Sequence, residues 1–203
     1  MTVRARSRRG EGERLRSEIL AATERLLIRT GDQTAVSVRA IAREVGVTPP
    51  SIYLHFADKT ELLFAVCATH FASLDEAIEA AAAGAVDALE ALRLRGRAYV
   101  RFGLDHPEQY RILFMSKPSA KPEGWSAEVL LDNAAFSHHV AAVARAFPHL
   151  ADPTTAAIGL WAAAHGVVSL LLAQPDFPWP DVDVLVDHVL ATQAAGIAAA
   201  SIV

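Results

Sequence analysis

Residues 48–59 gather side chains whose chemistry suits contact with a nucleic acid. Thr48 and Ser51 carry hydroxyl groups that can donate to or accept from base edges, and Pro50 offers an apolar face to a thymine methyl group. Polar tips suited to phosphate oxygens follow at Tyr53, His55 and Lys59. The order of these residue types predicts a segment that contacts bases at its start and phosphates further along.

Catalytic and metal-binding chemistry is poorly supported by the sequence. The chain contains none of the motifs GxSxG, HExxH, GxxxxGK[ST] or GxGxxG. On a helix, the adjacent His138 and His139 would point about 100° apart, so they cannot readily share one metal ion. His165 and Ser169 are spaced like a base and a nucleophile, but no acidic residue stands near them to orient the imidazole. We therefore predict no enzymatic activity, no metal site and no cofactor.

Cysteine content and hydropathy indicate a cytoplasmic protein. Cys67 is the single cysteine, so no disulfide can form within the chain. Residues 156–173 contain no charged side chain other than the titratable His165. This stretch of 18 residues reaches the minimum length for a membrane span. Asp152 and Asp176 flank this stretch without Lys or Arg anchors. A buried bundle or dimer helix is the prediction, with no membrane partner.

The elements that must position these groups are predicted to be helices. No stretch alternates with period two, and no Asn-Gly or Asp-Gly hairpin turn occurs. The ten prolines leave Pro-free stretches between them that suit helices. Apolar spacing and these stops predict helices over 13–30, 38–45, 49–56, 59–83, 86–106, 108–116, 125–147, 153–173 and 181–202. The predicted fold class is all-α.

The first three helices form a predicted helix-turn-helix arrangement. Ser37 is the expected N-cap of the second helix, and Gly46 is expected to end it. Thr48 is expected to cap the third helix, with Pro49 at the first position, where the missing N–H costs nothing. A glycine-containing turn would thus join the two helices that face the nucleic acid.

The charge of the chain is unevenly distributed. Residues 1–60 carry 11 Lys and Arg against 7 Asp and Glu, whereas residues 61–203 carry 8 against 16. A basic front end on an acidic body predicts a polyanionic partner at the N-terminus only. Two alternatives, minor-groove binding or a disordered solubility segment, stay open for the tail that carries Arg4, Arg6, Arg8 and Arg9.

A specific motif runs through residues 37–63, which read SVRAIAREVGVTPPSIYLHFADKTELL. Its parts are Ile41-Ala42, Val45-Gly46-Val47-Thr48, Ile52-Tyr53, His55-Phe56, Asp58-Lys59 and Glu61-Leu62-Leu63. The pattern resembles the DNA-binding region of TetR-family transcriptional regulators. Pro49-Pro50 departs from it, which bears on the bases contacted. The resemblance implies a DNA-binding site formed by Arg39, Thr48, Pro49, Pro50, Ser51, Tyr53, His55 and Lys59.

A second motif lies in residues 159–173, which read GLWAAAHGVVSLLLA, with Trp161, His165 and Gly166 as its marked positions. It is similar to the Trp-x-x-x-His-Gly signature in the C-terminal domain of one TetR subgroup. Such domains bind a small, mostly apolar effector and pair through their last two helices. Gly166 would let a neighbouring helix or ligand approach the backbone. The alternative is a packed core with a satisfied imidazole. The residues implied as an effector site are Phe102, Tyr110, Phe114, Trp125, Phe136, Trp161 and His165.

Together these patterns predict a basic flexible tail over 1–12, a helix-turn-helix domain over 13–60 and a helical effector-binding and dimerisation domain over 61–203. The leading hypothesis is a bacterial homodimeric repressor. It would bind a pseudo-palindromic, double-stranded DNA operator and leave it when a small apolar effector binds. Two other classes stay open: an architectural DNA-binding protein without ligand control, and a small-molecule-binding protein with no DNA role.

Overall fold

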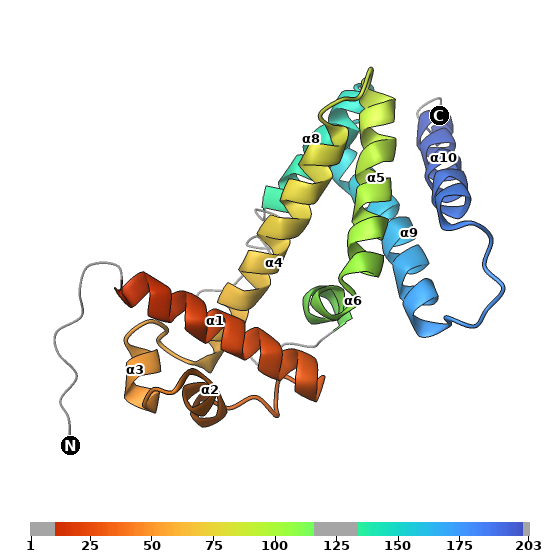
Figure 1. Cartoon of the computed structure of the whole chain (residues 1–203). Coiled ribbons are helices and arrows are strands. Elements are labelled where there is room, and N and C mark those ends of the chain that lie inside the picture. Colours follow the sequence, from red (N-terminus) through yellow and green to blue (C-terminus); the bar gives the residue numbers. More distant parts are fainter. Residues whose placement is uncertain (1–10, 116–133, 201–203) are drawn as a thin grey trace. The chain divides into compact units, whose positions relative to one another are not determined.

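The computed structural model describes residues 11–115 and 134–200, and within these ranges every regular element is helical (Figure 1). In chain order these elements are α1 (Glu11–Thr30), α2 (Val38–Val45), α3 (Pro49–Tyr53), α4 (Lys59–Ala82), α5 (Ala88–Asp105), α6 (Pro107–Tyr110), the π-helix η1 (Arg111–Met115), α8 (Ala134–Ala146), α9 (Pro153–Ala173) and α10 (Val182–Ala200). The predicted all-α fold class is confirmed.

The chain divides into two compact units. The described part of the first unit holds α1, α2, α3, the beginning of α4 as far as His70, and η1. The described part of the second unit holds α4 from Phe71 onward, together with α5, α6, α8, α9 and α10. Helix α4 therefore belongs to both units.

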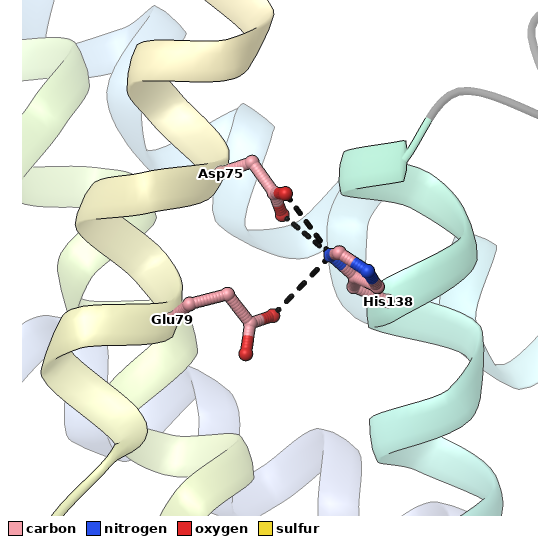
Figure 2. Close-up of side chains that lie close together, drawn as sticks. All are labelled: Asp75, Glu79 and His138. Atoms are coloured by element: carbon pink, nitrogen blue, oxygen red, sulfur yellow. Dashed lines mark hydrogen bonds and ion pairs between the residues drawn. The ribbon is translucent and has the colours of Figure 1, made fainter.

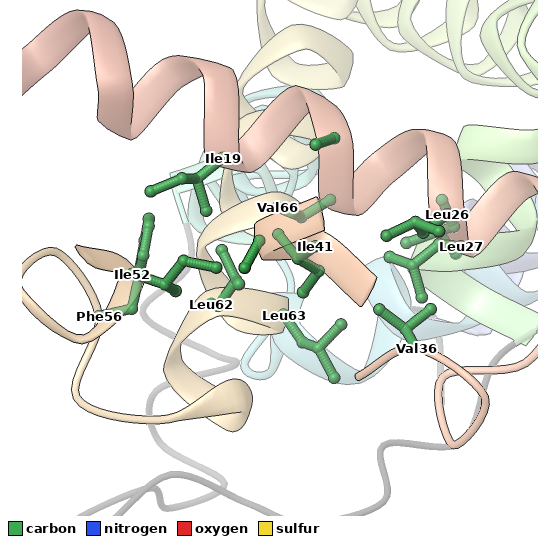
Figure 3. Close-up of a cluster of buried hydrophobic side chains, with 13 residues drawn as sticks. Ile19, Leu26, Leu27, Val36, Ile41, Ile52, Phe56, Leu62, Leu63 and Val66 are labelled. Carbon is green, nitrogen blue, oxygen red and sulfur yellow. The ribbon is translucent and has the colours of Figure 1, made fainter. Parts of the chain in front are cut away.

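The first unit is held together by apolar side chains from its helices (Figure 3). The buried members of this core are Ile19, Ala22, Leu26, Leu27, Val36, Ile41, Ala42, Ile52, Phe56, Leu62, Leu63, Val66 and Ile112. Ile52 and Phe56 are each only 1% exposed. Full burial of one such side chain stabilises a fold by about 1.5–3 kcal/mol, so Ile52 determines which side of α3 faces inward and Phe56 fixes the chain just after the helix.

The helix ends around the predicted turn follow the local sequence with one exception. Ser37 caps α2 as predicted, because its hydroxyl accepts a hydrogen bond from the Ala40 N–H at 3.2 Å. Gly46 ends α2 with a φ of 77°, in the left-handed region that favours glycine. The exception is α3: Thr48 is its N-cap residue and Pro49 its first residue, as predicted, but the Thr48 hydroxyl makes no capping hydrogen bond and the helix ends at Tyr53 instead of residue 56.

The two prolines at the start of α3 explain the missing cap. Pro49 and Pro50 have no N–H groups, so two of the donors that a cap would satisfy do not exist. The next donor, the Ser51 N–H, bonds to the Thr48 carbonyl at 2.9 Å. The Thr48 hydroxyl lies instead 3.1 Å from the Ser51 hydroxyl.

In the second unit, α9 packs against α5, α8 and α10. A glycine permits close packing at one point on α5, because a Cβ at Gly103 would lie 2.6 Å from Cγ1 of Val168 and 3.0 Å from Cδ2 of Tyr110. Helices α5 and α10 are joined by an ion pair between Arg97 and Asp187. These contacts hold the aromatic residues of α5, α6 and α9 close together.

Other helices differ from their predicted bounds by one or two residues at an end, and one predicted helix is divided. Helix α5 begins at Ala88 rather than residue 86, because the Asp87 carboxylate accepts a hydrogen bond from the Glu90 N–H at 2.8 Å and so acts as the N-cap. The predicted helix over 108–116 is divided into α6 and the π-helix η1. The predicted helix over 125–147 is described from Ala134 onward.

By length and composition alone, two described helices could cross a membrane. They are Pro153–Ala173 and Val182–Ala199. In the most apolar 18-residue stretch of each helix, 33% and 11% is buried, respectively. Core helices of soluble proteins have the same length and composition. The predicted role of residues 156–173 as a bundle helix agrees with the packing of α9 against three other helices.

Candidate nucleic-acid interface and effector site

Helix α3 turns an apolar side inward and a polar side outward. Ile52 is 1% exposed within the core, whereas the adjacent Tyr53 is 52% exposed. Thr48 and Pro50 are exposed, and Ser51 is half-buried. Because the hydroxyl groups of Thr48 and Ser51 lie 3.1 Å apart, they present a joint donor and acceptor at the start of the helix. The predicted base-contacting residues are thus accessible together.

The start of α4 positions the predicted phosphate contact Lys59. Asp58 accepts a hydrogen bond from the Glu61 N–H at 2.8 Å, and the Glu61 carboxylate accepts one from the Ala57 N–H at 2.5 Å. The Lys59 ammonium donates to the Gln33 carbonyl at 2.6 Å. An ammonium group has three N–H bonds, so this contact orients Lys59 without using its full donor capacity.

The remaining predicted DNA contacts differ in exposure. Arg39 on α2 is exposed, whereas Pro49 and His55 are half-buried. The predicted tail contacts at Arg4, Arg6, Arg8 and Arg9 lie outside the described residues. Within the first unit, Arg39 and Tyr53 are therefore the predicted phosphate contacts with the most accessible side chains.

Other arginines of the first unit are paired with an acidic side chain. Arg29 and Arg25 of α1 lie 3.1 and 3.4 Å from the carboxylate of Glu44 on α2. The hydrogen bond from Arg29 is the main reason why the pKa of Glu44 lies below its ordinary value. These pairs connect α1 to α2 and so support the helix-turn-helix; because two arginines share one carboxylate, the group keeps one net positive charge.

A hydrogen-bonded network of aromatic and imidazole groups lies in the second unit. The Trp161 indole N–H donates to the Tyr99 hydroxyl at 3.0 Å, which lies 3.1 Å from the Tyr110 hydroxyl. The Tyr110 hydroxyl lies 2.5 Å from Nδ1 of His165, and Nε2 of His165 lies 3.2 Å from the Ser169 hydroxyl. One proton arrangement satisfies these four contacts: Trp161 donates to Tyr99, Tyr99 to Tyr110, Tyr110 to Nδ1, and Nε2–H to Ser169.

The ionisable groups of this network are neutral near pH 7. Burial raises the pKa of Tyr110 to about 12 and also raises the pKa of Tyr99. Burial lowers the pKa of His165 below its ordinary value of 6.5. A neutral imidazole with its proton on Nε2 matches the arrangement above. The network is therefore uncharged, which suits contact with an apolar molecule.

Four predicted effector residues lie close together in the second unit. The ring centroids of Phe136 and Trp161 are 6.2 Å apart, and those of Tyr110 and His165 are 5.6 Å apart with the planes nearly parallel. Trp161 and His165, four residues apart on α9, have ring centroids 6.2 Å apart. The expectation that the Trp–His pair shares one face is confirmed.

The other predicted effector residues stand apart from this cluster or outside the described chain. Phe102 is buried, and its ring centroid lies 5.0 Å from that of His106. Phe114 lies in η1, within the first unit. Trp125 lies outside the described residues. Sequence reasoning missed Tyr99, which contacts Trp161 from a position 62 residues earlier in the chain.

The second unit also contains an open groove of about 490 Å³. Its apolar lining comes from α5, α9 and α10 and includes Leu89, Leu92, Leu160, Leu190 and Ala194. None of the predicted effector residues lines this groove. A Cβ at Gly166 would meet no heavy atom within 4 Å, so the predicted close approach at this glycine is not made by described residues of the same chain.

Two family models match the chain. The model described as "Bacterial regulatory proteins, tetR family" matches residues 19–66, and the model described as "Tetracyclin repressor-like, C-terminal domain" matches residues 92–193. The first match includes α2 and α3, which carry the candidate nucleic-acid interface. The second match includes α5 and α9, which carry the Tyr99–His165 network.

Individual relatives agree with these matches. The chain is 29% identical over 109 residues to the HTH-type transcriptional activator FasR of Mycolicibacterium smegmatis, and the match covers 53% of this chain and 49% of FasR. The chain thus spans about half the length of this relative.

Solved structures are similar over nearly the whole chain. A protein of unknown function from Rhodococcus sp. RHA1 is 28% identical, with 90% of this chain and 94% of that chain covered and a TM-score of 0.73. A TetR family transcription regulator from Marinobacter aquaeolei VT8 is 21% identical, with 93% and 97% covered and a TM-score of 0.71. At 21% identity, the similarity to the Marinobacter aquaeolei structure is evidence for the fold alone.

Proposed function

Because the chain belongs to the tetR family of bacterial regulatory proteins, we propose that it binds DNA sequence-specifically and regulates transcription. The observation that carries the proposal is the division of α3 into a buried apolar side and an exposed polar side. Ile52 fixes the helix on the core, while Thr48 and Ser51 present hydroxyl groups to solvent at its start. In helix-turn-helix proteins this end of the second helix contacts base edges in the major groove.

Phosphate contacts would hold α3 in register on the duplex. The exposed Arg39 and Tyr53 and the oriented ammonium of Lys59 are the groups proposed for this role. Such contacts add affinity for any sequence, whereas the Thr48–Ser51 hydroxyl pair would add preference among sequences.

Pairing of two copies through α9 and α10 is the second part of the proposal. Large apolar side chains of these helices are exposed in the single chain at Ile158, Trp161, Leu170 and Val184. A Cβ at Gly159 or Gly166 would meet no heavy atom within 4 Å, so part of the α9 backbone is open to a second chain. Two α3 helices set about 34–36 Å apart would read the halves of a pseudo-palindromic operator.

Release by a small, largely apolar effector is the third part. The proposed contacts are the rings of Phe136, Trp161 and His165, which belong to or adjoin the uncharged network. An effector that binds better to a state with low operator affinity must weaken DNA binding. By linkage, the DNA weakens effector binding by the same factor. A coupling of about 1–3 kcal/mol would reduce affinity about 5- to 150-fold. Helix α4, which belongs to both units, is the proposed carrier of this change.

The DNA-binding proposal is tested with duplex DNA from the region that flanks the chain's own gene. Footprinting is expected to show one protected pseudo-palindrome. Arg39→Gln is expected to weaken binding to all sequences and to lower the salt slope by about 1 per lost phosphate contact. Arg145→Gln on α8 is the matched control, because this exposed residue makes the same charge change outside the proposed interface. Failure of the wild-type chain to bind any duplex at low salt would overturn the proposal.

A second experiment separates the three function classes. Labelled operator DNA is titrated with the protein in the presence of a series of lipophilic compounds. A regulated repressor loses DNA affinity with one of them, an architectural protein keeps it with all, and a small-molecule-binding protein binds a compound without binding DNA. Transcription in vitro gives the direction of control: fewer transcripts are expected, and more transcripts would make the chain an activator.

A further inference from the structure

Three metal-ligating side chains that take no part in the Tyr99–His165 network converge in the second unit (Figure 2). Asp75 and Glu79 lie one turn apart on α4, and His138 faces them from α8. Nδ1 of His138 lies 3.0 and 3.1 Å from the two carboxylate oxygens of Asp75 and 3.6 Å from Oε1 of Glu79. One donor atom from each residue lies within 4.8 Å of the other two.

We propose that Asp75, Glu79 and His138 bind a divalent transition-metal ion of the zinc class. In a tetrahedral zinc site with bonds of about 2.0–2.2 Å, neighbouring ligand atoms stand about 3.4 Å apart. The distances of 3.0 and 3.6 Å from Nδ1 to the two carboxylates lie on either side of that value. The imidazole nitrogen favours zinc over Mg²⁺ and Ca²⁺, which prefer oxygen ligands alone.

The four-residue spacing of Asp75 and Glu79 on α4 indicates what a bound cation would do. Two carboxylates four residues apart on a helix share one face and repel each other. Here the imidazole of His138 stands opposite both of them, so a metal ion bound by all three groups would remove the repulsion and connect α4 to α8. Glu79 and His138 are exposed and Asp75 is half-buried, so a fourth position is open to water.

A buried arginine contacts one of the three proposed ligands. Arg95 of α5 is 4% exposed, and its guanidinium donates a hydrogen bond to Oε1 of Glu79. This bond holds the Glu79 carboxylate in its position beside His138. Carboxylates that bind metals are commonly fixed by such outer hydrogen bonds. With Asp75 and Glu79 ionised, Arg95 leaves the site with one net negative charge.

The simpler arrangement is an ion pair between a protonated His138 and the two carboxylates. The two arrangements exclude each other, because Nδ1 either carries a proton and donates it to Asp75 or offers its lone pair to a metal. The proposal does not depend on DNA binding, so failure of either one leaves the other unaffected.

The test uses the full chain without a histidine tag and titrates it with Zn²⁺ by calorimetry. One Zn²⁺ per chain is expected. His138→Ala and Asp75→Asn are each expected to weaken binding at least about tenfold. His188→Ala, an exposed histidine on α10, is the matched control and is expected to bind as the wild type does.

A spectroscopic readout identifies the ligands directly. Bound Co²⁺ is expected to give visible ligand-field absorption that His138→Ala abolishes and His188→Ala retains. Circular dichroism of each variant confirms that the helices are intact. Absence of stoichiometric Zn²⁺ binding, unchanged binding in His138→Ala, or an equal loss in His188→Ala would overturn the proposal and leave the ion pair as the only role of the cluster.

Discussion

The Tyr110 hydroxyl lies 2.5 Å from Nδ1 of His165, so a residue of α6 and a residue of α9 share a hydrogen bond inside the second unit. Tyr99 and Trp161 extend this contact to α5 and to the preceding turn of α9. Each group is a partner of the next, so removal of one hydroxyl takes a hydrogen bond from a neighbouring polar group inside or at the edge of the second unit. Such a loss costs about 1–3 kcal/mol in protein interiors.

Tyr99→Phe tests this dependence. Tyr99 is 7% exposed, and its hydroxyl accepts the indole N–H of Trp161. The substitution is expected to lower the free energy of unfolding by about 1–3 kcal/mol, measured by urea denaturation. Tyr53→Phe removes the same hydroxyl from a residue that is 52% exposed and is expected to change stability by less than about 0.5 kcal/mol. Equal effects of the two substitutions would contradict a structural role for the network.

Two glycines provide a second matched comparison. A methyl group at Gly103 would lie 2.6 Å from Cγ1 of Val168, whereas one at Gly159 on α9 would meet nothing within 4 Å. Gly103→Ala is therefore expected to destabilise the fold by about 1–3 kcal/mol through overpacking. Within the single chain, Gly159→Ala is expected to be neutral or to stabilise by up to about 1 kcal/mol through helix propensity, and a clear loss would place Gly159 in a close contact with a second chain. Thermal unfolding of both variants measures the difference, and a stable Gly103→Ala variant would mean that α5 and α9 pack more loosely.

Local signals in the sequence predict the helix-turn-helix accurately. The bounds of α2 agree with the predicted 38–45, because Ser37 and Gly46 act through hydrogen bonds within a few residues of themselves. The same local reasoning failed at Thr48, since the two prolines after it remove the donors that a cap would satisfy. The absence of a capping hydrogen bond could have been predicted from the sequence, because it depends on which backbone N–H groups exist.

Contacts between distant residues were not predictable in this way. His138 lies 63 residues after Asp75, and Lys59 lies 26 residues after its partner Gln33, so no spacing rule connects them. The negative prediction for a metal site considered short sequence motifs and the adjacent histidines at 138 and 139. Helix packing places His138 opposite α4, where Asp75 and Glu79 lie one turn apart and face it.

Ser51→Ala tests the proposed base contact. The Ser51 hydroxyl pairs with the exposed Thr48 hydroxyl, so its loss is expected to leave the stability of the fold unchanged. Discrimination at one base position of the operator is expected to fall by about 1–3 kcal/mol. Competition between operators that differ at single positions measures this change. Thr48→Ser keeps a hydroxyl group and serves as the control, and a uniform loss of affinity in Ser51→Ala would assign Ser51 to phosphate contact.

Stability is expected to fall as the pH falls below 6.5. Burial lowers the pKa of His139 below its ordinary value of 6.5, and Nε2 of His139 lies 3.0 Å from the Ala157 carbonyl oxygen. In this range the unfolded chain binds a proton that the folded chain does not, so protonation favours unfolding. Above 6.5 the histidine is neutral in both states, and its contribution is constant.

His139→Asn isolates that contribution. Urea denaturation of the wild type at about pH 7.5 and about pH 5.5 is expected to show a loss of stability to which burial of His139 contributes. In His139→Asn the loss between the two pH values is expected to be smaller, even if the variant is less stable at both. His188→Asn changes an exposed histidine of α10 and is expected to retain the wild-type difference. If His139→Asn kept the full pH dependence, the proton uptake would belong to other buried histidines, among which His70 and His165 also have lowered pKa values from burial.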